Sequence, residues 1–189
     1  MDKLLTEIKN CTVCAPDLPH PPRPVMSAAP DSKILIIGQA PGRKVHESGV
    51  PWDEPSGDLL RKWLGIDKAA FYNPQKIGIV PMGFCYPGKG KSGDLPPRPE
   101  CAPLWHPQLF AHFNNVQLTL LIGQYAQRYY LQDKAKKNLT ETVRHFEQYL
   151  PRYLPLPHPS PRNRFWMAKN PWFQEQVLPR LQILAGEIL

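Results

Sequence analysis

The stretch from Lys33 to Leu64 constrains the fold of this chain more than any other. It opens with a continuous apolar run, residues 34–37, which is typical of a strand buried on both faces of a parallel sheet. The run ends at residues 38–42 (GQAPG), where two glycines and a proline require a tight turn. In open α/β sheets ligands bind at the carboxyl ends of the strands. This turn is therefore a candidate wall of a binding site, although a glycine turn can also serve the fold alone.

A loop with one aromatic residue and two acids, residues 52–54 (WDE), follows the turn. Residues 55–58 (PSGD) then lead into apolar positions at helical spacing, which predicts a helix over residues 57–64. The order of strand, glycine turn, aromatic and acidic loop, and helix is typical of a pocket for a small ligand or a nucleic-acid base.

Helical and strand patterns alternate along the rest of the chain. Further strands are predicted at residues 77–80, 117–122 and 153–156, and helices at residues 2–10, 104–113, 124–131, after a capping box formed by Asn138 and Glu141, and at 171–187. A proline-rich stretch, residues 15–30, and a stretch rich in glycine, proline and lysine, residues 82–101, predict irregular connections. Strands separated by helices predict an α/β fold, a three-layer sandwich around a central, mainly parallel four-stranded sheet. The length of 189 residues fits one domain, residues 1–189.

The composition bears on the partner and the compartment. A net charge of +7 favours an anionic partner such as nucleic acid. No apolar run is long enough for a transmembrane helix. The first residues, MDKLLTEIKNC, lack the apolar core of a signal peptide, so we expect an intracellular, cytoplasmic protein. We also expect a monomer.

The four cysteines form two pairs. Cys11 and Cys14 make a CxxC, whereas Cys85 and Cys101 lie far downstream, with fifteen residues between them. Four thiolates suit a tetrahedral zinc site or a [4Fe–4S] cluster. Free buried thiols and a disulfide are the alternatives, and an intracellular compartment disfavours the disulfide. Because zinc ribbons use two CxxC pairs and the second pair here is widely spaced, we favour iron–sulfur over zinc.

These motifs together resemble a known family. Residues 38–42 after the first strand and 158–161 (HPSP) after the last resemble the two signature loops of the uracil-DNA glycosylase superfamily. Residues 49–52, 56–60 and 121–126 are similar to segments between those loops. The cysteine layout resembles the iron–sulfur (family 4 type) branch, in which a CxxC is completed by two cysteines flanking a Pro/Arg-rich loop. The resemblance runs from Cys11 to about Arg180, and the segment after the last signature loop resembles a bacterial subgroup to which we attach no defined substrate.

The resemblance implies a DNA glycosylase, an enzyme that hydrolyses the N-glycosidic bond of uracil or another deaminated base in base excision repair. The partner would be DNA that contains such a base, extruded from the stack so that the bond becomes accessible. His158 would donate a hydrogen bond to O2 of the departing base, whose ring becomes negative. Trp52 stands where the family has a phenylalanine that stacks on the base. The alternatives are that His158 only stabilises its loop and that Trp52 is an ordinary core residue.

The resemblance also implies the residues that contact substrate and DNA. The pocket would be lined by Gly38, Gln39, Ala40 and Gly42. Ser160 and Pro161 would hold the phosphates, and Arg162 with Asn163 replaces the usual apolar wedge. Asn163 would also contact the substrate. Further candidate phosphate contacts, which would make binding depend on salt, are Lys89, Lys91, Arg98, Arg164 and Lys169.

Two departures from the family pattern affect the chemistry. Ala40 stands where the best-known branch has the aspartate that positions water, and Asp53 or Glu47 is our candidate replacement. Glu54 and Asp58 also lie close in sequence, and Asp58 could instead cap the following helix. The asparagine that reads uracil in related enzymes would fall near Cys85, or at Pro81 by the cysteine alignment, and proline offers no donor. Selectivity for uracil is therefore open.

Two other functions compete with the glycosylase. One is a non-catalytic member of the same fold that binds a base or nucleotide without cleaving it, which the residues at 40 and 81 favour. The other is a zinc-stabilised interaction module.

Overall fold

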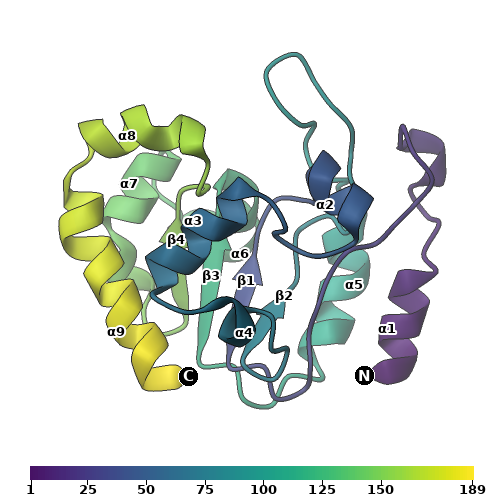
Figure 1. The fold of residues 1–189 in the computed structure, drawn as a ribbon, viewed down its shortest axis with the longest axis horizontal. Coiled ribbons are helices and arrows are strands. Elements are labelled where there is room, and N and C mark those ends of the chain that lie inside the picture. Colours follow the sequence, from purple (N-terminus) through teal and green to yellow (C-terminus); the bar gives the residue numbers. More distant parts are fainter.

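The computed structural model describes all residues, 1–189, and contains one four-stranded sheet at its centre (Figure 1). The strands are β1 (Ile34–Ile37), β2 (Ile77–Ile79), β3 (Leu118–Ile122) and β4 (Tyr153–Leu156). Their order is β2-β1-β3-β4 and every neighbouring pair is parallel, with Ile34 of β1 opposite both Ile77 and Leu118. The predicted sheet is confirmed. Because β2 and β3 lie on opposite sides of β1, the order reverses there, and such a switch point is a usual place for a ligand.

Nine α-helices surround the sheet. They are α1 (Asp2–Lys9), α2 (Arg43–Ser48), α3 (Pro55–Leu64), α4 (Lys68–Phe71), α5 (Cys101–Phe110), α6 (Gln124–Leu131), α7 (Leu139–Arg144), α8 (Arg164–Lys169) and α9 (Leu178–Ile188). Short 3₁₀ turns lie at residues 15–17, 132–134, 146–149 and 161–163. None of the helices is both long enough and apolar enough to cross a membrane.

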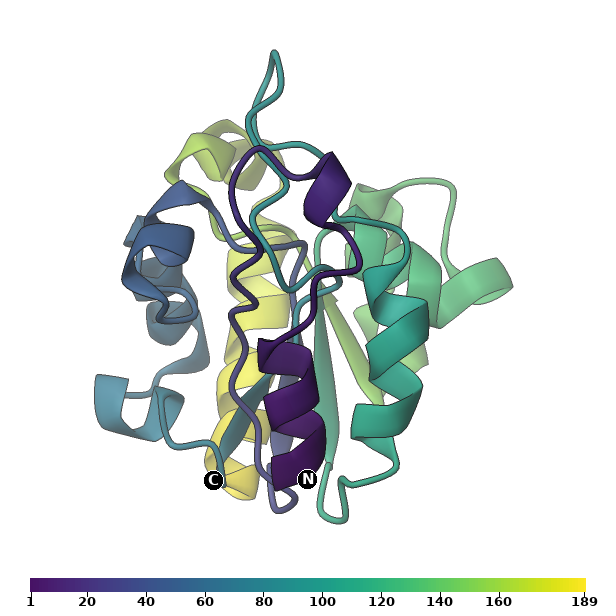
Figure 2. The same ribbon diagram turned by 90° about the vertical axis from the view of Figure 1, so that its right-hand side faces the viewer.

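Alternating side chains of the strands supply two apolar faces. Ile34 and Ile36 of β1 belong to a core cluster with side chains of α3 and α9, whereas Ile37 packs in a second cluster with residues of α5 and α6. Figure 2 shows α9 on one side of the sheet and α5 on the other. Since successive strand residues point to opposite faces, an unbroken apolar run is what this three-layer arrangement requires.

The structure differs from the sequence-based expectations mainly in short or interrupted helices. Helices α2, α4 and α8 were not predicted, because four to six residues give too little periodicity. Helix α5 begins three residues before the predicted start. The last helix is broken by a π-helical turn, Phe173–Val177, ahead of α9. Pro179, which has no N–H to continue the regular ladder, lies at this junction.

The loops that follow the strands gather at one edge of the sheet, the upper edge in Figure 1. Residues 38–42 leave β1 there, residues 157–163 leave β4, and a long hairpin between β2 and α5 projects furthest. Most of the predicted site residues belong to these loops and therefore lie at this edge.

Candidate functional site

A small cavity lies between the loops that follow β1, β2 and β4. The rings of Trp52 and His158 stack within it, with centroids 5.6 Å apart and planes 28° apart. The cavity is about 30 Å³ and opens onto a cleft of about 490 Å³. Predicted site residues that line the cavity are Gly38, Gln39, Ala40, Gly42, Trp52, Pro81 and His158. Seven predicted residues from three separate loops thus meet at one place.

The backbone of Trp52 is strained. Its φ of +58° lies in the left-handed region, which is costly for a residue with a side chain. Two glycines, Gly38 and Gly57, pack against this residue. A Cβ on Gly38 would come within 3.1 Å of the indole, and a Cβ on Gly57 of α3 would lie 1.9 Å from the Trp52 carbonyl oxygen. The loop thus packs closely against both glycines, and at Gly57 there is no room for a Cβ unless the Trp52 backbone moves.

We expect the change Gly57→Ala to destabilise the fold by about 1–3 kcal/mol, because the added methyl overlaps the Trp52 carbonyl and the loop must move. Urea denaturation would measure the loss. Gly186→Ala is the matched control, since a Cβ at that position of α9 has open space around it. It should stabilise the protein by about 0.5–1 kcal/mol. Equal effects of the two changes would contradict the steric assignment.

His158 is held by its own loop. Its carbonyl oxygen accepts hydrogen bonds from the Asn163 side-chain amide at 2.7 Å and from the Ser160 N–H at 2.8 Å. Burial lowers the pKa of His158, and the nearby Asp94 carboxylate opposes that shift. The imidazole is accordingly neutral at pH 7. Asn163, which we had expected to bind substrate, does not line the cavity and instead fixes the His158 loop.

Two carboxylates converge beside His158. Glu54 is the N-cap residue of α3, and its Oε1 accepts a hydrogen bond from the Ser56 hydroxyl at 2.7 Å. A Cβ built on Gly42 would lie 3.0 Å from Glu54 Oε2 and 3.6 Å from Asp94 Oδ2. The absence of a side chain at residue 42 leaves room for both acids. Glu54 borders the cavity and the cleft, and Asp94 borders the cleft.

The two acids that we had favoured lie elsewhere. Glu47 is on α2, where its exposed carboxylate pairs with Arg43 at 2.8 Å. Asp53 is exposed and lines neither the cavity nor the cleft. Asp58 does not cap α3, because the helix begins at Pro55, and it pairs with Arg61 instead. The structure brings none of these three to His158.

Asp94 reaches the cleft from the projecting hairpin, residues 88–95. The hairpin is closed by hydrogen bonds from Leu95 N–H to the Gly88 carbonyl at 2.8 Å and from Gly90 N–H to the Gly93 carbonyl at 2.6 Å. The side-chain amide of Gln39 donates to the Leu95 carbonyl at 3.1 Å, so it anchors the hairpin to the first signature loop. The sequence analysis missed Asp94, because no local pattern in this Gly- and Lys-rich loop predicts that its carboxylate lies at the cleft.

Partial burial and the nearby Glu54 raise the pKa of Asp94. The nearby Tyr86 hydroxyl and the cationic Arg162 oppose this effect, as does His158 when it is protonated. The negative charge of Glu54 therefore favours the protonated form of Asp94.

Pro81 lies at the cavity wall and is fixed from behind by a core histidine. The Nε2 of His106 lies 3.0 Å from the Pro81 carbonyl oxygen, and its Nδ1 contacts the Tyr130 hydroxyl. Burial lowers the pKa of His106 to about 4, so the ring is neutral at pH 7. Sequence patterns gave His106 no role, and its role here is to support the wall.

The cleft mouth carries exposed cationic side chains. Ser160, Pro161 and Arg162 line the cleft, and the Ser160 hydroxyl accepts the Arg162 N–H at 3.2 Å. The Arg164 guanidinium lies 4.9 Å from the ring centroid of Phe165, which is 66% exposed. Lys89 and Lys91 are exposed on the hairpin. Of the predicted basic contacts, Arg162 thus lines the cleft, Lys89 and Lys91 lie on the adjoining hairpin, and Arg164 and Lys169 lie on α8. Arg98 lies apart from them, at the cysteine cavity.

The four cysteines line one second cavity. Cys11, Cys14, Cys85 and Cys101 are free and half-buried there, among mostly apolar side chains. The Phe84 N–H donates to Cys101 Sγ at 3.3 Å. No three Cys, His, Asp or Glu side chains lie close enough to share a single ion. Burial raises the pKa of Cys85 to about 11 and that of Cys101 to about 12, so metal binding there would release protons.

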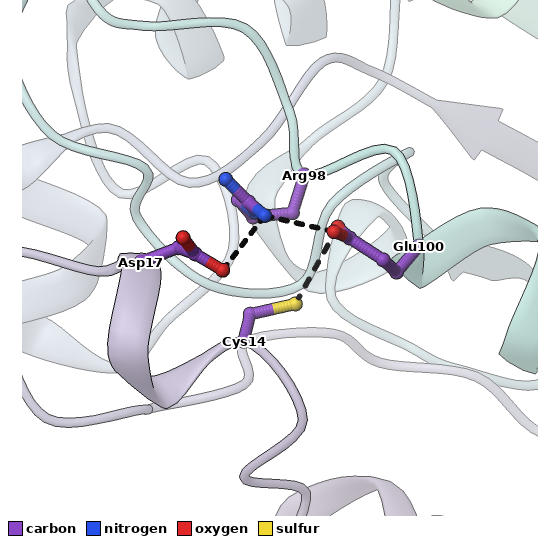
Figure 3. Close-up of polar contacts among 4 residues, drawn as sticks. All are labelled: Cys14, Asp17, Arg98 and Glu100. Atoms are coloured by element: carbon purple, nitrogen blue, oxygen red, sulfur yellow. Dashed lines mark hydrogen bonds and ion pairs between the residues drawn. The ribbon is translucent and has the colours of Figure 1, made fainter.

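Arg98 borders the cysteine cavity and joins its two sides (Figure 3). Its Nη2 donates to Asp17 Oδ2 and to Glu100 Oε1, each at 2.8 Å. The other oxygen of Glu100 lies 4.0 Å from Cys14 Sγ. Arg98 was predicted as a phosphate contact, but its Nη2 is engaged by these acids.

Residues 26–182 match the family model described as the uracil DNA glycosylase superfamily. The matched range contains both signature loops, Glu54 and Asp94, and two of the cysteines. It begins after Cys11 and Cys14, so the first cysteine pair lies outside it.

Proposed function

Because the chain belongs to the uracil-DNA glycosylase superfamily, we propose that it hydrolyses the bond between deoxyribose and uracil, or another deaminated base, in DNA. The observation that carries the proposal is the meeting of Trp52, His158 and Glu54 in one cavity at the carboxyl ends of the strands. This arrangement places a stacking surface, a neutral donor and a carboxylate together.

Base recognition begins with extrusion of the base from the helix, because the bond cannot be reached within the stack. The cavity of about 30 Å³ has room for water but not for a base. The entering base therefore has to part the rings of Trp52 and His158 and take the place of the imidazole against the indole. A base stacked on an aromatic side chain gains about 1–3 kcal/mol.

Bond cleavage leaves a negative charge on the base and a positive charge on the sugar. The C1′–N bond breaks with its electron pair remaining on the base, and the neutral His158 donates a hydrogen bond to the oxygen that becomes negative. A water oxygen bonds to C1′, and its proton passes to the Glu54 carboxylate, which replaces Asp53 and Glu47 in this role. The Asp94 carboxyl group adds to the field that favours the sugar cation.

The protein would bind DNA at this cleft mainly through contacts to the phosphates. The exposed cations at the mouth and on the hairpin, Lys89, Lys91, Arg162 and Arg164, would contact them, with Ser160 and Pro161 shaping the adjoining loop. Counterion release from DNA then makes the affinity fall steeply with salt.

We also propose that the four cysteines hold a [4Fe–4S] cluster. The thiols share one cavity, and the wide spacing of the second pair supports a cluster over zinc, because zinc ribbons use two CxxC pairs. When bound, it would tie the segment that carries Cys11 and Cys14 to the chain between β2 and α5. The segment after β2 lines the base cavity at Pro81 and the cysteine cavity at Cys85, so the two sites are mechanically connected.

The activity is tested with labelled single- and double-stranded oligonucleotides that contain uracil, hypoxanthine or xanthine. We expect an abasic product from at least one lesion. If no lesion is cleaved while DNA binding persists, the chain is instead a nucleic-acid-binding member of the fold. The alanine at residue 40 and the closed cavity favour that second function.

The change Glu54→Gln should lower the single-turnover rate of base release by about 100-fold, because the amide cannot accept the water proton. Asp53→Asn is the matched control, since this neighbouring acid lies outside the cavity, and it should leave the rate close to that of the wild type. An equal loss in both variants would reject the assignment of Glu54.

A further inference from the structure

A buried donor beside the cysteine cavity has no acceptor within the protein. Nε of Arg98 is buried and makes no hydrogen bond, although Nη2 of the same guanidinium bonds two carboxylates. The only other buried side-chain nitrogen or oxygen without a partner is Nδ1 of His46. Buried N–H groups in folded proteins are nearly always paired, because leaving one unpaired is costly.

The residues around Arg98 limit which chemical groups can accept a hydrogen bond from its Nε. The cavity that it borders is lined by four thiols and by apolar side chains such as Phe84 and Trp105. The only other charged residues close to the guanidinium, Asp17 and Glu100, are already bonded to Nη2. The acceptors that the cavity lining offers to Nε are the sulfurs of the cysteine site, and a thiolate-ligated cluster supplies such sulfurs with negative charge.

We propose that Nε of Arg98 donates a hydrogen bond to the sulfur shell of the cluster and is the positioning residue that retains it. The inference rests on the proposed cluster of the preceding section, but not on glycosylase activity. Beside the cluster, a cationic donor stabilises negative charge on the sulfurs, and hydrogen bonds to these sulfurs raise the reduction potential.

Arg98 has a second, separable role. Through Asp17 it holds the turn that follows the CxxC, and through Glu100 it holds the residue next to Cys101 (Figure 3). These carboxylates are about half exposed, and exposed ion pairs contribute little to stability. Asp17→Asn removes one ion pair and leaves Nε in place. Arg98→Met removes both roles, and Arg98→Lys keeps the charge without the Nε donor.

The experiment compares these three variants with the wild type after anaerobic purification. The measurements are iron and sulfide content, the rate at which a chelator bleaches the visible absorbance, the reduction potential, and folding by circular dichroism. We expect Arg98→Met to bleach several-fold faster and to have a more negative potential, and Asp17→Asn to resemble the wild type. Arg98→Lys should also bleach faster, and it replaces Arg98→Met in the comparison if the methionine variant does not fold.

The outcomes separate this inference from the proposals on which it depends. A wild-type protein that holds no iron and sulfide overturns the cluster and the role of Arg98 together. A loaded wild type whose arginine variants bleach no faster and keep its potential overturns the role of Arg98 alone. Equal effects of Asp17→Asn and Arg98→Met would assign the retention to the ion pairs and also overturn it. Failure to cleave any DNA lesion bears on the glycosylase proposal only.

Discussion

Replacement of His158 by alanine is expected to lower the single-turnover rate of base release by about 100- to 1,000-fold, the range found when one donor to a developing oxyanion is removed. His158 lines the cavity and can present a neutral N–H to the base, because burial lowers its pKa. The measurement is the rate of abasic-site formation at saturating enzyme, so that weaker DNA binding does not enter the result.

Two further variants make the result specific. His158→Gln keeps a neutral donor and should retain more activity than His158→Ala. His112→Ala changes an exposed histidine that lines neither the cavity nor the cleft, and it should leave the rate unchanged. A His158→Ala enzyme that releases the base at the wild-type rate would show that the histidine serves only the loop.

Replacement of Cys101 by serine should have the largest effect on stability. Cys101 is the first residue of α5, and its sulfur accepts the Phe84 N–H, so its replacement would affect both the proposed cluster and the packing between β2 and α5. We expect loss of the visible absorbance and a decrease in the free energy of unfolding of about 4 kcal/mol or more. Metal analysis and urea denaturation measure the two effects.

The controls for this variant use the first cysteine pair. Thr12→Ser lies between Cys11 and Cys14 but changes no ligand, and it should retain metal and stability. Wild-type protein from which a chelator has removed the metal should approach the stability of Cys101→Ser. A Cys101→Ser protein with full iron content would exclude this cysteine as a ligand.

Much of the fold could be predicted because its signals are local. The apolar run at residues 34–37 requires burial on two faces, and the glycines and proline after it require a turn, whatever the rest of the chain does. Such short patterns also predict the four strands and the loops at their carboxyl ends, and they carry the family resemblance. The shortest helices could not be predicted, because their few residues carry no periodicity.

The carboxylate that we propose to accept the water proton shows where local reasoning fails. Asp53 and Glu54 are adjacent in sequence and chemically similar, so no pattern separates them. The start of α3 at Pro55 makes Glu54 the N-cap residue, where the Ser56 hydroxyl holds its carboxylate beside Gly42, and leaves Asp53 exposed. One residue of difference along the loop thus decides which acid meets His158.

The sequence by itself determined the strands, the two signature loops and the CxxC of the first cysteine pair, since each depends on residues that are close along the chain. The tertiary structure alone decided that Asp94 meets Glu54 over Gly42, that Trp52 and His158 close the cavity by stacking, and that Nε of Arg98 borders the four thiols without a partner. These contacts join residues tens of positions apart, and only the packing of the whole chain fixes their distances.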